Sequence, residues 1–262
     1  MSNGLIYPPI DKEPSYLPPP RAPQSPPKSG GKKLGFWGLL AVLFAKFKFL
    51  LMGLLKLKTL FSMLLFFGVY WNQWGWPFAL GFVLSIYIHE MGHVAALKHY
   101  GIEASAPLFI PFIGAIIRVK QSMPNRIQDA RVGLAGPFWG LGAAVFAYAL
   151  YAYTQQEILL AISRTAAWIN LFNLIPFWQL DGGRGFRSLD RTQRFMAAGA
   201  IGLAFYYTQE YLLLALLGFA LYQSLRQEVS EEPDWTGLAQ YVFLIAILSA
   251  MCMIPGAGIP QS

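Results

Sequence analysis

The stretch SIYIHEMGHVAAL, Ser85–Leu97, decides how the chain is interpreted, because it places three costly polar side chains in an otherwise apolar run. His89 and His93 are four residues apart, so on a helix both imidazoles lie on one face and can reach one ion. Glu90 lies about 100° further round the helix, where it can contact a water on that ion but is poorly aimed to ligate it. This HExxH spacing is typical of a zinc-activated water with a carboxylate base.

The composition around this motif indicates a membrane protein. Of the 262 residues, 55% are hydrophobic and 13% are charged, whereas average soluble domains carry about 25% charged residues. Ionisable residues inside such apolar segments are expensive, so His89, Glu90 and His93 are candidates for a functional site. The net charge of +7 comes from Lys and Arg clustered between apolar runs, where it sets membrane orientation and favours anionic lipid headgroups. We therefore expect the lipid bilayer as a partner and exclude nucleic acid.

Apolar runs of about 20 residues predict helices that span the bilayer. We predict an all-α polytopic membrane protein, a bundle of about six to seven transmembrane segments with an N-terminal interfacial helix and a short β or loop insertion. The candidate segments are 59–73, 77–98, 131–153, 157–178, 193–207, 211–225 and 235–254. Segment 193–207 is short and could be partly re-entrant. The insertion is APLFIPFIGAIIRV, 106–119, a short strand, a hairpin or a partly inserted loop.

Four regions are predicted along the chain. Residues 1–33 are rich in proline, lysine and serine, and we expect a disordered tail. Residues 34–58 are predicted to lie at the membrane interface as a helix, because Lys46 and Lys48 sit near its centre. A first spanning helix is the alternative for this segment. We expect residues 59–255 to form the transmembrane core that carries HExxH, and residues 256–262 to be a C-terminal tail.

The distribution of basic residues predicts the orientation. Loops 98–131 and 179–194 each carry several Lys or Arg residues, whereas the intervening links NQWGW, TQQE and TQE carry none. Positively charged loops stay on the cytoplasmic side. We therefore expect a multi-pass protein of the cell (inner) membrane whose N-terminus and active-site side are cytoplasmic.

A catalytic zinc needs a third protein ligand, and the sequence offers two candidates. His99 follows the motif at a suitable spacing, but Ala96 stands where a helix-breaking glycine would be needed, so we reject His99 as a ligand and interpret it as a basic residue at a helix end. Asp181, in NLFNLIPFWQLDGGRG, lies at the predicted cytoplasmic end of a later helix, after Pro176 has ended that helix. A solvated turn is the alternative, and the pairing with HExxH favours the ligand. The single cysteine, Cys252, excludes a zinc site built from two cysteines of this chain.

The combination of motifs resembles the site-2 protease family of intramembrane zinc metalloproteases. The matching stretches are HEMGH (89–93), PFIGA (111–115), GLAGPFWG (133–140) and NLIPFWQLDGG (173–183). At position 140 the family often has asparagine and this chain has glycine, which permits close helix packing.

The resemblance implies that His89, His93 and Asp181 bind one Zn²⁺ and that Glu90 is the catalytic base. It also implies that Asn173 helps to hold the substrate carbonyl or oxyanion. Substrates would be membrane proteins cut within or near their transmembrane segments, with the 106–119 segment as an edge that receives an unwound substrate. A non-catalytic metal-binding or transport protein, or an inactive protease homologue, are the alternatives.

Overall fold

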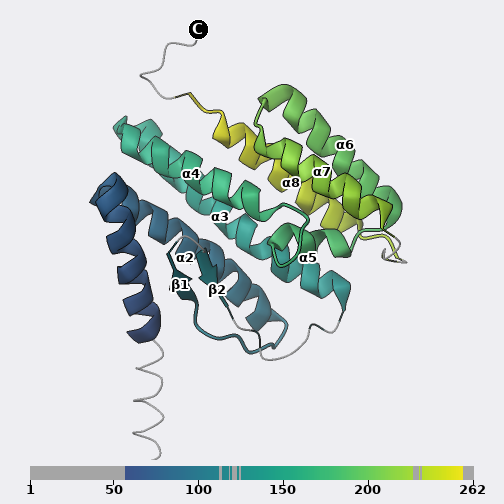
Figure 1. Ribbon diagram of the computed structural model, residues 1–262, viewed down its shortest axis with the longest axis horizontal. Helices are drawn as coiled ribbons and strands as arrows, with labels where there is room; N and C mark the ends of the chain where they lie inside the picture. Colours follow the sequence, from purple (N-terminus) through teal and green to yellow (C-terminus); the bar gives the residue numbers. More distant parts are fainter. Residues whose placement is uncertain are drawn as a thin grey trace, which may run out of the picture. The chain divides into compact units, whose positions relative to one another are not determined.

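The computed structural model describes residues 57–255, except 112–113, 118, 120–122, 124, 227–229 and 231. Most of this part of the chain is helical (Figure 1). The helices are residues 57–74, α2 (Trp76–His99), α3 (Arg126–Thr154), α4 (Glu157–Asn173), α5 (Asp181–Arg187), α6 (Arg191–Thr208), α7 (Leu212–Leu225) and α8 (Trp235–Cys252). The predicted tails 1–33 and 256–262, and all but the last two residues of 34–58, lie outside the described residues.

Helices form at every apolar segment that the sequence predicted within this part of the chain. Three of them, α2, α3 and α8, are long and apolar enough to cross a membrane. Helix α4 has 17 residues, α6 has 18 and the apolar α7 has 14. The mostly helical architecture with a small two-stranded sheet is therefore confirmed, whereas six to seven spanning segments stay a prediction. Segment 157–178 was expected to be longer than α4, which ends at Asn173 before the turn that leads to Pro176.

Local capping explains where these helices begin. The helix 57–74 and α2 are separated by Gly75, whose φ of 82° suits a residue without a side chain, and Pro77 stands in the first turn of α2. The side chain of Asn125 accepts a hydrogen bond from the backbone N–H of Gln128 and begins α3. Helix α6 begins with a capping box formed by Asp190 and Gln193.

Helix α3 is the element that the others share. It contacts α2, α4, α5 and α8. A large apolar cluster, which includes Leu171, Leu216 and Tyr241, joins α3 and α4 to the C-terminal helices. A separate aromatic cluster, around Phe66 and Phe82, joins the helix 57–74 to α2. Helix α3 therefore lies between the HExxH helix α2 and the α5 helix that begins at Asp181.

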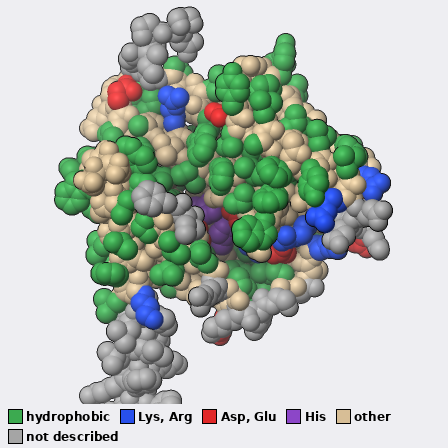
Figure 2. All heavy atoms as spheres, viewed as in Figure 1, with side chains coloured by type: hydrophobic (Ala, Val, Ile, Leu, Met, Phe, Trp, Pro, Cys, Tyr) green, Lys and Arg blue, Asp and Glu red, His purple; other side chains and the backbone are tan. Residues whose placement is uncertain are grey.

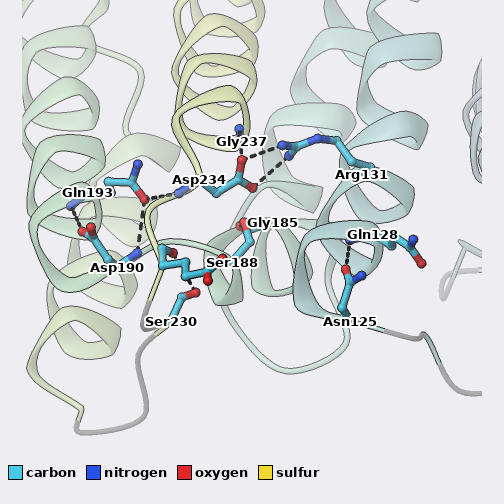
Figure 3. Close-up of polar contacts among 11 residues, drawn as sticks. Asn125, Gln128, Arg131, Gly185, Ser188, Asp190, Gln193, Ser230, Asp234 and Gly237 are labelled. Atoms are coloured by element: carbon cyan, nitrogen blue, oxygen red, sulfur yellow. Dashed lines mark hydrogen bonds and ion pairs between the residues drawn. The ribbon is translucent and has the colours of Figure 1, made fainter.

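A buried polar network ties the starts of α3, α6 and α8 together (Figure 3). Arg131 donates to both carboxylate oxygens of Asp234, at 3.0 and 2.5 Å, and Asp234 also accepts from the backbone N–H of Gly237. The Gln193 side-chain oxygen accepts from the backbone N–H groups of Asp190 and Asp234. Since each of these residues lies at or near a helix start, the network holds three helix ends on the side of the bundle where Asp181 lies.

The insertion between α2 and α3 contains a short antiparallel hairpin. Strands β1 (Leu108–Ile110) and β2 (Gly114–Ile116) pair with Phe109 opposite Ala115. The outer edge of β1 is occupied, because the Phe109 N–H donates to the Ser62 hydroxyl and the Thr59 hydroxyl donates to the Pro107 carbonyl. The segment therefore contains the hairpin that was one of the interpretations left open for it, whereas its partial insertion into the bilayer stays a prediction.

Candidate metal centre

Helix α2 and the first residue of α5 bring three ligand groups together. His89 Nε2 lies 3.1 Å from Asp181 Oδ2, His93 Nε2 lies 3.2 Å from Asp181 Oδ1, and the two Nε2 atoms are 3.1 Å apart. A tetrahedral zinc with bonds of about 2.0–2.1 Å separates its ligand atoms by about 3.3 Å. The three side chains are all buried. In the described part of the chain, they form the group of His, Cys, Asp or Glu side chains whose ligand atoms lie close enough together to share one metal ion.

The hydrogen bonds of the two Nδ1 atoms indicate that the two Nε2 atoms are placed to bind a cation. His93 Nδ1 lies 2.8 Å from the Val132 carbonyl oxygen, and His89 Nδ1 lies 2.7 Å from the Asn170 Oδ1. Both partner oxygens only accept, so each Nδ1 carries a proton, and a neutral ring then turns the lone pair of its Nε2 inward. Two imidazole lone pairs and a carboxylate then face one another, an arrangement that repels itself unless a positive charge lies between them.

The space for this centre comes from a glycine on α3. A Cβ added at Gly136 would lie 2.8 Å from His89 Nε2 and closer still to the ring of His93. A second glycine, Gly92 on α2, lets the backbones of α2 and α3 approach, since its added Cβ would lie 2.9 Å from the Trp139 Cβ. The centre therefore fits between the helices because neither position carries a side chain.

Asp181 reaches the two histidines from a tight turn. The chain leaves α4 at Asn173 and turns before Asp181 starts α5, and a Cβ added at Gly182 would lie 2.7 Å from the Leu174 Cα. The turn therefore presents both oxygens of the Asp181 carboxylate to the histidines, at 3.1 Å from His89 Nε2 and 3.2 Å from His93 Nε2.

A cavity of about 880 Å³ opens onto this centre. Glu90 and Asn173 line it together with the three ligand side chains, so the structure places all five predicted site residues around one space. Figure 2 shows histidine side chains at the bottom of an opening bordered by hydrophobic side chains. The cavity wall is apolar at Phe82 and Ile86 and charged at Arg184, so apolar and charged side chains line the same space.

His99 does not join the centre. It is the last residue of α2, and its ring contacts Tyr100, with the two ring centroids 5.2 Å apart. It lies outside the group of residues that can share a metal among those the structure describes. Rejecting His99 as a ligand is therefore supported by its position.

Asn170 is a residue of the site that the sequence did not single out. It lies in α4, one turn before Asn173, is 2% exposed, and contacts His89. The stretch NLFN contains two asparagines three residues apart, and the sequence motif drew attention only to the second. The sequence signal for Asn170 is its spacing of three residues from Asn173, which places both amides on the same side of a helix.

The chain is similar to known metalloproteases over its central part. The sequence model of Peptidase family M50 matches residues 77–168, which include HEMGH but end before Asp181. Probable zinc metalloprotease EGY1, chloroplastic, from Arabidopsis thaliana is 27% identical over 212 residues, covering 60% of this chain and 37% of that protein. Zinc metalloprotease MJ0392 from Methanocaldococcus jannaschii is 30% identical over 124 residues, covering 44% of this chain and 34% of that protein.

The chain thus spans little more than a third of the length of these curated relatives. The family match includes the first motif, and the structure brings the second motif against it through Asp181. Residues 77–168 of this chain thus match the model of peptidase family M50, the site-2 protease family, and the matched relatives are named as zinc metalloproteases.

Proposed function

We propose that the chain is an intramembrane zinc metalloprotease that hydrolyses peptide bonds within or near transmembrane segments of membrane proteins. The observation that carries the proposal is the convergence of three buried electron-pair donors, His89, His93 and Asp181, on one point beside Glu90. A bound Zn²⁺ would supply Lewis acidity there and lower the pKa of a water to about 7.

The residues around that point have distinct tasks. Glu90 accepts a proton from the attacking water and delivers it to the leaving amine, since it lines the same cavity as the ligands. Asn173 lines the cavity from the end of α4 and donates its amide to the substrate carbonyl as negative charge develops on its oxygen. His89, His93 and Asp181 hold the ion.

The cavity suits a substrate that arrives from the bilayer. Its wall carries the apolar side chains of Phe66, Phe82 and Ile86 from the helix 57–74 and α2. Hydrolysis also needs water, and the charged Asp129 and Arg187 line another part of the same cavity. We infer that an apolar peptide enters from the lipid side and that water enters past the charged residues.

Among the residues that the structure describes, no strand pairs with the outer edge of β2, and this edge is the proposed place for the unwound substrate. Because the Phe109 N–H points away from β2 to reach Ser62, the Phe109–Ala115 pair is not hydrogen-bonded, and the N–H and carbonyl of Ala115 point to the opposite edge. Ala115 lines the cavity, and helix 57–74 already covers the β1 edge. A substrate strand would therefore add to β2.

This edge can be tested by one backbone change. An Ala115→Pro variant removes the outward N–H, whereas Ala115→Ser keeps it with a similar side-chain volume. Cleavage of a membrane-spanning peptide should fall at least tenfold in the proline variant and stay near the wild-type rate in the serine variant. Equal cleavage by both variants would count against strand addition at β2.

The location follows from the positions of the basic residues. Arg131, Arg184 and Arg194 lie near the starts of α3, α5 and α6, on the side of the bundle to which Asp181 belongs. Since positive residues favour the cytoplasmic side, we propose that the active-site side and the N-terminus face the cytoplasm in the cell (inner) membrane.

The decisive experiment separates metal binding from catalysis. Full-length protein in detergent or lipid discs should hold one zinc per chain and cleave a membrane-spanning peptide. Glu90→Gln should keep the zinc and lose cleavage by about 10²–10⁴-fold, because the base is removed but no ligand is. Asp181→Ala should lose both. Zinc binding without cleavage in the wild type would favour a non-catalytic metal protein or an inactive homologue, and unchanged cleavage in Glu90→Gln would refute the mechanism.

A further inference from the structure

The imidazole of His89 is held from behind by a buried amide on another helix. Asn170 Oδ1 lies 2.7 Å from His89 Nδ1, and Asn170 Nδ2 donates to the Ala166 carbonyl at 2.7 Å. Because the Ala166 carbonyl can only accept, the amide orientation is fixed, and the atom that faces His89 is the oxygen. Asn170 thus leaves His89 a single tautomer, with the proton on Nδ1.

The amide has room only because α3 carries a glycine beside it. A Cβ added at Gly140 would overlap the Asn170 side chain, with its three nearest neighbours all atoms of that amide. Helix α3 contacts both α2 and α4, so Gly140 lies where a side chain would otherwise separate them. The position of the amide therefore depends on Asn170, which carries it, and on Gly140, which leaves space for it.

The two histidines differ in this respect. His93 Nδ1 is held by a backbone carbonyl, that of Val132, which every residue at that position would provide. His89 Nδ1 is held by a side chain that substitution can remove. The hydrogen bond to the non-ligating nitrogen orients a metal-binding histidine and raises its basicity, and losing such a partner typically costs 10–100-fold in metal affinity.

We propose that Asn170, with Gly140 providing its space, is the positioning residue that fixes the tautomer and ring orientation of His89 for metal binding. This proposal rests on the metal-binding role proposed above. Asn170 acts on the metal only through His89, and it does so across a contact between α4 and α2.

Three variants separate this role from a general effect on folding. Asn170→Leu removes the hydrogen bond at similar volume, and Asn170→Asp keeps an acceptor for His89 Nδ1. Gly140→Ala leaves every ligand in the sequence and pushes the amide away. Gly142→Ala is the matched control on the same helix, because an added Cβ there meets nothing within 4 Å.

The measurements are the affinity of the full-length protein for Zn²⁺, by competition with a chelator, and the visible absorption spectrum after loading with Co²⁺. We expect Asn170→Leu and Gly140→Ala each to weaken Zn²⁺ binding by about 10–100-fold and to alter the Co²⁺ spectrum. Asn170→Asp should bind Zn²⁺ more tightly than Asn170→Leu, because one carboxylate oxygen still accepts from His89 Nδ1 although the donor to the Ala166 carbonyl is lost. Gly142→Ala should change neither readout. A purely structural role would lower the melting temperature without this rescue.

Combining the substitutions tests whether Gly140 acts through Asn170. The double variant Gly140→Ala/Asn170→Leu should bind Zn²⁺ no more weakly than the worse single variant, because both changes break one hydrogen bond. Wild-type affinity in Asn170→Leu, or full additivity in the double variant, would overturn the proposal. If the wild type bound no Zn²⁺, the proposed function would fail and this proposal with it. If the wild type bound Zn²⁺ and Asn170→Leu bound it equally well, this proposal alone would fail.

Discussion

Gly136→Ala is the substitution that tests the geometry of the metal centre most directly. Its Cβ would lie 2.8 Å from His89 Nε2, about 0.7 Å inside an ordinary contact of about 3.5 Å, and closer still to the ring of His93. Metal–ligand distances tolerate only about 0.2 Å of change. Both imidazoles would have to move by several times that tolerance, so we expect Zn²⁺ affinity to fall at least about 100-fold, beyond the loss typical of changes outside the ligand shell.

The assay is the zinc content of purified full-length protein after dialysis against a graded series of chelator concentrations. Thermal unfolding of the same samples shows whether the helices still assemble. Gly142→Ala is again the control, since it lies six residues further along α3 in open space. A Gly136→Ala protein that keeps one zinc per chain at wild-type affinity would refute the inference that the imidazoles meet the ion at this glycine.

Further predictions concern the turn, the substrate site and the helix ends. Gly182→Ala should reduce zinc content, because the added Cβ would collide with the backbone of Leu174 and displace the turn; wild-type zinc content would contradict this. Asn173→Ala should lower kcat about 10²–10³-fold with zinc retained if its amide holds the developing oxyanion, and an unchanged kcat would exclude that role. Asp234→Asn should destabilise the protein by about 3 kcal/mol or more, since it leaves the half-buried Arg131 charge without its partner; an unchanged melting temperature would argue against it. Burial raises the pKa of Asp234, but the hydrogen bonds from Arg131, the Gly237 N–H and Ser188, together with the Arg131 charge, more than offset this and lower the pKa. The pair therefore stabilises the fold fully above about pH 4, the ordinary carboxyl pKa, and less as the pH falls through the lowered value. The wild type should show this acid-dependent loss in melting temperature, and Asp234→Asn should lack it.

The sequence predicted the helices well because their signals are local. Apolar runs and capping residues such as Asn125 and Asp190 fix where a helix can begin, and the observed α3 and α6 start within a few residues of the predicted segments. The number of spanning segments is harder, because a helix such as α4 is short and carries Arg164. Whether it crosses the bilayer depends on its neighbours and on lipid depth, which no local pattern records.

The metal centre was predictable to the extent that its residues carry rare chemistry. His89 and His93 stand out because ionisable groups in apolar segments are costly, whereas Asp181, at the end of a later helix, was identified through its pairing with HExxH. Asn170 does not stand out, since a buried amide in a helix is ordinary until its partner is known. Its role appears only when α2 and α4 are placed side by side, 81 residues apart in sequence at the His89–Asn170 hydrogen bond.

A single face of α3 explains how these pieces fit. Gly133, Gly136 and Gly140 are spaced by three and four residues, so they line one side of the helix. Added Cβ atoms would meet Asp181 and Arg184 at the first position, His89 and His93 at the second and Asn170 at the third. From sequence, the last glycine suggested only close helix packing. In the structure each glycine faces a different part of the metal centre. Helix α3 packs so closely against these groups that a side chain at any of the three positions would collide with them.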